Sequence, residues 1–141
     1  MTEKISLIYN GRWLPLLAWM ALIYAVSADP NPYRSAVQDL GGAPGPARAA
    51  PGRVLPALEN EQLGKVSHLG EYVVLGLLAL RALRPYGGRV LLRAALLCLG
   101  YALLDEIHQH FVPGRAFQLA DLGLDLLGST LGAWLGQRLF R

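Results

Sequence analysis

The hydrophobic positions of this chain fall into four blocks that are separated by short polar stretches. The blocks lie at about residues 10–28, 63–83, 89–107 and 117–138. A helix needs roughly 20 predominantly apolar residues, with a range of about 17–25, to cross the hydrocarbon core of a bilayer. The pattern therefore predicts an all-α fold, an integral membrane bundle of four transmembrane helices. We expect residues 1–141 to form a single membrane domain.

Composition separates the chain from ordinary soluble domains. Hydrophobic residues make up 53% of the 141 residues and charged residues 16%, whereas soluble domains average roughly 45–50% and about 25%. The single cysteine, Cys98, makes a disulfide scaffold implausible. The formal net charge is +3, but the arginines lie at the ends of the apolar blocks. A nucleic-acid binder would gather them in one basic patch, so we predict no nucleic-acid partner.

The segment 29–60 is predicted to be a long loop on the outer side, because it holds six prolines and four glycines. Within it, Pro56 suits the first turn of a helix, and the acidic residues that follow suit a positive N-terminal helix end. The second helix is therefore expected to start near Pro56. The first block has a second interpretation as the apolar region of a signal peptide, because basic residues precede it and small residues follow it.

The distribution of basic residues predicts the orientation of the bundle. With the N-terminus in the cytoplasm, eight Lys and Arg residues flank the cytoplasmic ends of the helices and five lie on the outer side. Cytoplasmic loops carry the excess of Lys and Arg, so the count favours cytoplasmic N- and C-termini. The eight are Lys4, Arg12, Arg81, Arg84, Arg89, Arg93, Arg138 and Arg141.

Ionisable residues lie inside three of the predicted spans, where they are costly. An ionised residue at mid-helix costs about 2.5–3.5 kcal/mol on insertion scales, against about −0.3 to −0.6 kcal/mol for a Leu, Ile, Phe or Val. Such side chains must face each other or a water-filled cavity. Successive residues of a helix are about 100° apart, so the polar residues of each of these spans fall on one helix face, within an arc of about 80–100°. The sets are Lys65, His68 and Tyr72 on the second helix, Asp105, His108 and Gln109 on the third, and Asp121 and Asp125 on the fourth.

Small residues continue these faces toward the inner end of the bundle. Gly128, Gly132 and Gly136 follow at intervals of four residues on the face of the two aspartates. Such a run can be a dimer seam, but its position favours an intramolecular packing seam. Together the faces predict a tightly packed bundle below a polar pocket that opens outward. Glu106 and His110 lie off the stripe of the third helix, which favours positions at the membrane interface.

Three blocks of these residues, in this order, resemble the motifs of the VanZ-like family. The blocks are Lys65-x2-His68-x2-Glu71-Tyr72, Asp105-Glu106-x-His108-Gln109-x-Phe111-x3-Arg115, and Asp121 followed by Gly128. The resemblance covers all four apolar blocks. It implies a small multi-pass protein of the bacterial cytoplasmic (inner) membrane, in a family whose founding member is linked to teicoplanin resistance. Two features depart from the family pattern, because Asp125 stands where the family often has Asn and the segment 29–60 looks longer than is typical.

The resemblance and the polar faces together imply an outward-facing site for the cell envelope. We expect it to bind and chemically process, by hydrolysis or group transfer, a phosphate-bearing envelope lipid or a lipid-linked cell-wall precursor. Arg115 and Lys65 would hold the phosphate, the first as a bidentate fork and the second as a point charge. His68 or His108 would be the nucleophile or the general acid and base. The other candidates are Glu71, Asp105 and Asp121 for catalysis and Tyr72, Glu106, Gln109 and Asp125 for substrate binding.

Other functions stay open at this point. The second is a non-catalytic protein that binds or shields a cell-wall precursor or a glycopeptide such as teicoplanin. Transport or proton relay is less favoured, because the polar residues gather at one end of the spans and leave no path across. Membrane lipids are partners in each case, and the sequence does not fix the oligomeric state.

A divalent metal is a further alternative. His68 and Glu71 are three residues apart, as are Asp105 and His108, and pairs of histidine and carboxylate at this spacing can ligate zinc from one helix face. A charge-paired polar network with Lys65 and Arg115 as counter-ions explains the same residues. We therefore assign no metal ligands from the sequence, and the cofactor is unknown.

Overall fold

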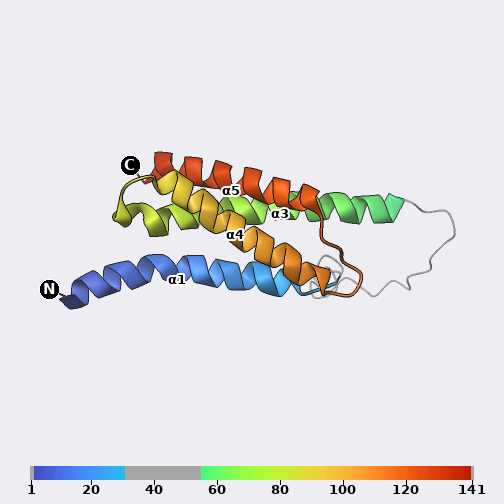
Figure 1. The fold of residues 1–141 in the computed structure, drawn as a ribbon, viewed down its shortest axis with the longest axis horizontal. Coiled ribbons are helices and arrows are strands. Elements are labelled where there is room, and N and C mark those ends of the chain that lie inside the picture. The colour runs from blue at the N-terminus through green and yellow to red at the C-terminus, as the bar shows by residue number, and fades with distance from the viewer. Residues whose placement is uncertain (1, 31–54, 141) are drawn as a thin grey trace.

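The computed structural model describes residues 2–30 and 55–140, with side chains for residues 11–30 and 65–140. The described residues contain helices and no strands, which confirms the all-α prediction (Figure 1). The elements are α1 (Thr2–Ser27), α3 (Leu55–Leu83), the short 3-10 helix η1 (Arg84–Tyr86), α4 (Val90–His110) and α5 (Leu119–Leu139).

The helix bounds differ most from the prediction at the start of the first two helices. α1 begins at Thr2 rather than near residue 10, because no Gly or Pro interrupts residues 2–9. It continues through Pro15, which lacks the N–H that would bond to the preceding turn. α3 begins at Leu55, so Pro56 lies in the first turn, where the missing N–H costs nothing. The end of the predicted loop is therefore helical, while residues 31–54 lie outside the described part of the chain.

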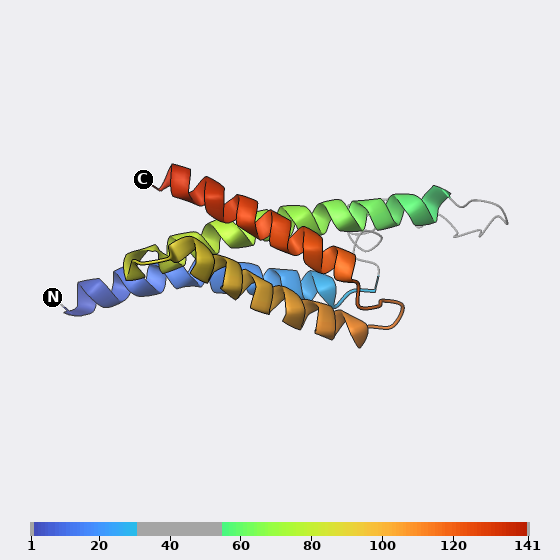
Figure 2. The ribbon, with the colours of Figure 1, turned by 45° about the horizontal axis from the view of Figure 1, so that its top comes forward.

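The four α-helices run roughly along the long axis of the molecule (Figures 1 and 2). α3 and α5 pack side by side, α1 packs against α3, and α4 contacts both α5 and α3 and crosses toward α1 at one end. The start of α1, the end of α5 and the η1 turn lie at one end of the bundle. The end of α1 and the connection from α4 to α5 lie at the other end, which we call the acidic end because Asp105, Glu106 and Asp121 lie there.

Glycines set the close approach of α3 and α5. A Cβ atom added at Gly128 would lie 2.6 Å from the carbonyl oxygen of Leu69. At Gly132 it would overlap the carbonyl group of Val73. Both helices therefore meet at the level of the backbone, where only glycine fits. The glycine run of α5 is an intramolecular packing seam, as the sequence favoured.

Glycines with positive φ form the two short connections. Gly87 and Gly88, with φ of 63° and 69°, link η1 to α4. Gly114, with φ of 84°, follows Pro113 in the connection from α4 to α5. L-residues with side chains rarely adopt this conformation. The turn at Pro113-Gly114 brings Arg115 back toward the end of α1, where its guanidinium donates to the carbonyl oxygen of Ser27 at 3.3 Å.

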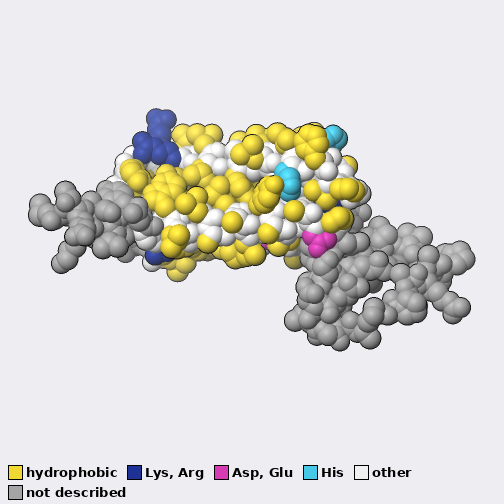
Figure 3. Space-filling view, turned by 90° about the horizontal axis from the view of Figure 1, so that it is seen from below, with side chains coloured by type: hydrophobic (Ala, Val, Ile, Leu, Met, Phe, Trp, Pro, Cys, Tyr) yellow, Lys and Arg dark blue, Asp and Glu magenta, His cyan; other side chains and the backbone are white. Residues whose placement is uncertain are grey.

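The bundle exposes apolar side chains and buries ionisable ones. Val66 is 68% exposed and Leu104 65%, whereas Glu106 and Asp125 are fully buried. Figure 3 shows hydrophobic side chains along the flank of the bundle and Lys and Arg near one end. Soluble domains almost never bury Asp or Glu fully unless the group is paired. The inverted distribution is that expected of helices surrounded by an apolar medium.

Length and composition identify one membrane-crossing candidate in the described residues. The segment Lys65–Tyr86, 22 residues long, is both long and apolar enough to cross, and Gly11–Ser27 is apolar but shorter. α4 and α5 each have 21 residues, a length of about 32 Å. They match the roughly 30 Å hydrocarbon core in length, but their ionisable residues lower their hydropathy.

Candidate functional site

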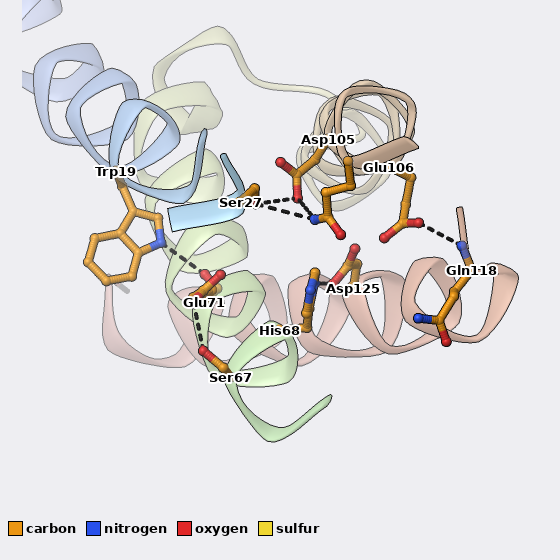
Figure 4. Close-up of polar contacts among 10 residues, drawn as sticks. Trp19, Ser27, Ser67, His68, Glu71, Asp105, Glu106, Gln118 and Asp125 are labelled. Carbon is orange, nitrogen blue, oxygen red and sulfur yellow. Dashed lines mark hydrogen bonds and ion pairs between the residues drawn. The ribbon is translucent and has the colours of Figure 1, made fainter. Parts of the chain in front are cut away.

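Three helices bring His68, Glu106 and Asp125 together inside the bundle, near its acidic end. We call these three residues the His68 cluster. They come from α3, α4 and α5 respectively, and Figure 4 shows their side chains directed toward one another. The Nδ1 atom of His68 lies 3.2 Å from Oδ1 of Asp125. Each residue offers one nitrogen or oxygen atom, and these atoms all lie within 4.8 Å of one another.

The His68 cluster is shielded from solvent and incompletely hydrogen-bonded. His68 is 6% exposed, and the other two residues are fully buried. Glu106 accepts a hydrogen bond at Oε2 from the backbone N–H of Gln118, at 2.8 Å. Within the described part of the chain, Oε1 of Glu106 and Oδ2 of Asp125 have no hydrogen-bond partner. An unpaired buried polar group costs about 1–3 kcal/mol, and more when charged, so these two oxygen atoms are the unexplained feature of the site.

A second polar network joins α1 to α4 beside the His68 cluster. The hydroxyl of Ser27 donates to Oδ2 of Asp105 at 3.0 Å, and Nε2 of Gln109 donates to the same oxygen at 2.9 Å. Arg115 closes the network through its bond to the Ser27 carbonyl oxygen. The predicted partners Asp105, Gln109 and Arg115 thus lie together, held by the last residue of α1.

Asp121 lies one helical turn before Asp125 on α5, on the same face. It is buried, and its Oδ1 atom has no hydrogen-bond partner among the described residues. Its backbone N–H donates to the carbonyl oxygen of Gln118, which starts the helix. A third carboxylate therefore borders the His68 cluster.

Glu71 lies apart from the His68 cluster. Its carboxylate accepts a hydrogen bond from the hydroxyl of Ser67 at 2.7 Å, and its backbone oxygen accepts one from the indole N–H of Trp19 at 2.9 Å. Figure 4 shows this group on the side of α3 that faces α1. The pairing of His68 with Glu71 that the spacing allowed is not observed, because Glu71 bonds to Ser67 and His68 contacts Asp125.

His108 also lies apart, stacked on a ring of α1. Its imidazole and the ring of Tyr24 have centroids 4.2 Å apart and an interplanar angle of 23°. His108 is half-buried, and its Nδ1 atom has no described partner. Tyr72 is fully buried against the same core, also with its hydroxyl unpaired among described residues, and Lys65 is half-buried on α3.

The expectation that Glu106 lies at the membrane interface is wrong. Asp105 and Gln109 face α1, and Glu106 lies about 100° further round α4, where it meets the start of α5. Because α4 contacts α5, α3 and α1, two adjacent acids on it are both buried, on different sides. His110 is exposed, as expected for a position off the stripe.

Sequence reasoning missed Ser27 and Gln118. Ser27 was classed only among the small residues that end the first block, and Gln118 contributes a backbone N–H. Neither residue type signals its role in the sequence. Ser27 donates to Asp105, and the backbone N–H of Gln118 donates to Glu106, only because the end of α1 and the start of α5 lie beside α4.

Comparisons with known proteins place this arrangement in context. The model of the VanZ/LLP1 family matches residues 12–141, which include the whole His68 cluster and the neighbouring network. A comparison with curated proteins and a comparison with solved structures each returned no match.

Proposed function

The chain belongs to the VanZ/LLP1 family, and from this premise we propose that it is a multi-pass protein of the bacterial cytoplasmic membrane that binds and chemically processes a phosphate-bearing envelope lipid or a lipid-linked cell-wall precursor. The processing is a hydrolysis or a group transfer. The observation that carries the proposal is the buried pair of His68 and Asp125, 3.2 Å apart.

The inverted surface supports four crossings. Exposed leucines lie along α1, α4 and α5 as well as on the flank of the bundle shown in Figure 3. Helices of 21 to 29 residues are long enough to span the hydrocarbon core. The buried acids then face protein rather than lipid, which reduces the cost that makes them unfavourable on a hydropathy scale.

The charge distribution supports cytoplasmic N- and C-termini. The start of α1, the η1 turn and the end of α5 lie together at one end of the bundle (Figure 1). Within the described side chains that end carries arginines and no acids. They are Arg12, Arg81, Arg84, Arg89, Arg93 and Arg138. The acidic end of the bundle then faces outward, at the level of lipid headgroups in the outer leaflet.

The pair of His68 and Asp125 has the parts of an acid–base catalyst. When Asp125 is ionised and His68 is neutral, the carboxylate accepts the hydrogen bond and the proton between the two groups lies on Nδ1 of His68. Nε2 then carries a lone pair that can accept a proton from a nucleophile or a leaving group. Asp125 orients the ring, as the third group of a catalytic triad does. Arg115 and Lys65, half-buried near this end, supply cations for a phosphate.

The test is turnover by the purified full chain in detergent or nanodiscs. Prenyl phosphates, prenyl pyrophosphates and phospholipids are offered in turn, and release of phosphate or of a headgroup is followed. His68→Ala should lower turnover by about 10²–10⁴-fold, the usual contribution of a general acid or base. His110→Ala is the matched control, because this histidine is exposed and outside the polar networks, and it should retain full turnover. Absence of turnover with every substrate class would exclude the catalytic proposal.

Burial favours a second candidate, a non-catalytic protein that binds or shields a cell-wall precursor or a glycopeptide. His68 and Asp125 are almost fully enclosed, and enclosed polar pairs commonly hold helices together. In that case crosslinking or calorimetry with a lipid-linked precursor detects binding, and His68→Ala weakens it while no product forms. The presence or absence of product separates the two candidates.

A further inference from the structure

We infer that the His68 cluster is a binding site for a divalent transition-metal ion, with Zn²⁺ as the best fit. The inference rests on the proposed function only in its location, since it concerns the same buried site. It depends on the ligand atoms, their mutual distances and their unpaired oxygens, each of which is observed independently of any substrate.

The geometry of the three residues fits a metal centre. One nitrogen and two carboxylate oxygens, from three different helices, lie within 4.8 Å of one another. Ligands that bind zinc at about 2.0–2.2 Å are themselves separated by roughly 3–4 Å. The contact of 3.2 Å between Nδ1 of His68 and Oδ1 of Asp125 already lies in this range, and a bound ion would replace the proton that lies between these two atoms in the metal-free protein. Ligand atoms that are still as much as 4.8 Å apart must approach by roughly 1 Å when an ion binds.

The unpaired oxygens point to a missing ligand. Oε1 of Glu106 and Oδ2 of Asp125 are buried, lack partners among the described residues, and belong to side chains directed into the same space (Figure 4). Buried charges in proteins are paired or coordinate metals. Tyr72 on α3 and Asp121 on α5 are also buried, and each has an oxygen without a partner among the described residues.

The charges of the buried side chains also favour a bound cation. Four carboxylates, those of Asp105, Glu106, Asp121 and Asp125, are buried in this region beside a single imidazole. A divalent cation compensates two of the negative charges. In the proposed function, a bound cation would add its positive charge to those of Arg115 and Lys65 and so favour the binding of a phosphate.

The donor set selects the kind of metal. An imidazole with two carboxylates is a mixed nitrogen and oxygen set, which suits Zn²⁺ and its neighbours in the first transition row. Mg²⁺ and Ca²⁺ prefer oxygen ligands alone. Catalytic zinc sites keep three protein ligands and an open position, and the His68 cluster offers three ligands. Asp121, one turn before Asp125, is a further buried carboxylate with an oxygen that lacks a partner among the described residues.

The test measures metal binding by the full chain without any substrate. The protein is purified in detergent, stripped with a chelator, and titrated with Zn²⁺, Mn²⁺ or Mg²⁺, and metal content after dialysis is measured by elemental analysis. We expect about one Zn²⁺ per chain and a Zn²⁺ affinity well above that for Mg²⁺. Glu106→Gln and Asp125→Asn should each weaken Zn²⁺ binding by about tenfold or more. Glu71→Gln, which alters an acid outside the cluster, should bind as the unaltered chain does.

A spectroscopic arm covers the case in which a variant fails to fold. Co²⁺ added to the unaltered chain should give visible absorption bands that Zn²⁺ abolishes. Metal content no higher than that of a detergent blank, equal affinity for Mg²⁺ and Zn²⁺, or binding that both cluster variants leave unchanged would each overturn the inference. Turnover by a chain that binds no metal would remove this inference and leave the proposed function intact. Stoichiometric zinc binding without turnover of any substrate would support this inference and exclude the catalytic proposal.

Discussion

The seam between α3 and α5 gives the most direct test of the fold. Gly132→Ala adds one methyl group where the Cβ would overlap the carbonyl group of Val73. At Gly128 the corresponding distance to the Leu69 oxygen is 2.6 Å, whereas the closest favourable carbon–oxygen contacts are about 3.3–3.6 Å. The obstacle is backbone in both cases, so no side-chain rotation relieves the overlap, and one helix must move.

Overpacking of this kind costs about 1–3 kcal/mol, occasionally more. A backbone obstacle places Gly132→Ala at the upper end, a loss of about 3 kcal/mol in the free energy of unfolding. The matched control is Gly123→Ala on the same helix. Gly123 is exposed and a Cβ there meets nothing within 4 Å. This control should gain about 0.5–1 kcal/mol, because alanine favours the helix more than glycine does.

The assay is denaturant or thermal unfolding in detergent micelles, followed by circular dichroism, with oligomeric state measured by light scattering. The two variants should differ by roughly 3–4 kcal/mol. Equal stability within about 0.5 kcal/mol, the usual scatter for surface substitutions, would refute the intramolecular seam. Loss of a dimer in Gly132→Ala, with an unchanged stability of the monomer, would instead assign the glycine run to a contact between chains.

The other predictions concern the orientation of the bundle, its polar network and the coupling of the seam to the site. In a chain whose native cysteine is replaced by alanine, an impermeant maleimide should label Pro113→Cys in intact cells and Arg89→Cys only after permeabilisation, and the opposite result would reverse the orientation. Ser27→Ala removes a donor to a buried carboxylate and should lower the free energy of unfolding by about 1–3 kcal/mol, and an unchanged unfolding curve would contradict the network. Gly128→Ala should weaken Zn²⁺ binding more than Gly136→Ala, because the only close contact of a Cβ added at Gly136, at 2.9 Å, is with the flexible end of the Leu80 side chain. Equal affinities would show that seam and site are independent.

Helical periodicity accounts for what the sequence predicted well. Asp105 and Gln109, four residues apart, share a face of α4 and do hydrogen-bond to each other's side chains. Asp121 and Asp125 likewise share a face of α5 that continues into the glycine seam. Such predictions need only the angle between residues on one helix, and that angle is nearly constant.

The partners across helices could not be read from the sequence. The 100° step that separates Glu106 from Asp105 turns one toward α5 and the other toward α1, and only the packing of α4 between its neighbours decides that both are buried. Glu71 shows the opposite case, since an acid three residues from His68 is bonded to Ser67 instead. The ligand-like group therefore forms between helices, and the spacing within one helix indicated the wrong pairs.

The seam and the acidic end are two parts of one packing solution. On α5 the same face carries Asp121 and Asp125 at one end and three glycines at the other. Backbone contact at the glycines fixes the separation of α3 and α5 to a value too small for side chains there. One turn beyond Gly128 the helices accommodate a histidine and an aspartate between them, in contact at 3.2 Å. Backbone contact at the glycines therefore limits how far apart α3 and α5 can lie at His68 and Asp125, and such a constraint favours a preorganised site.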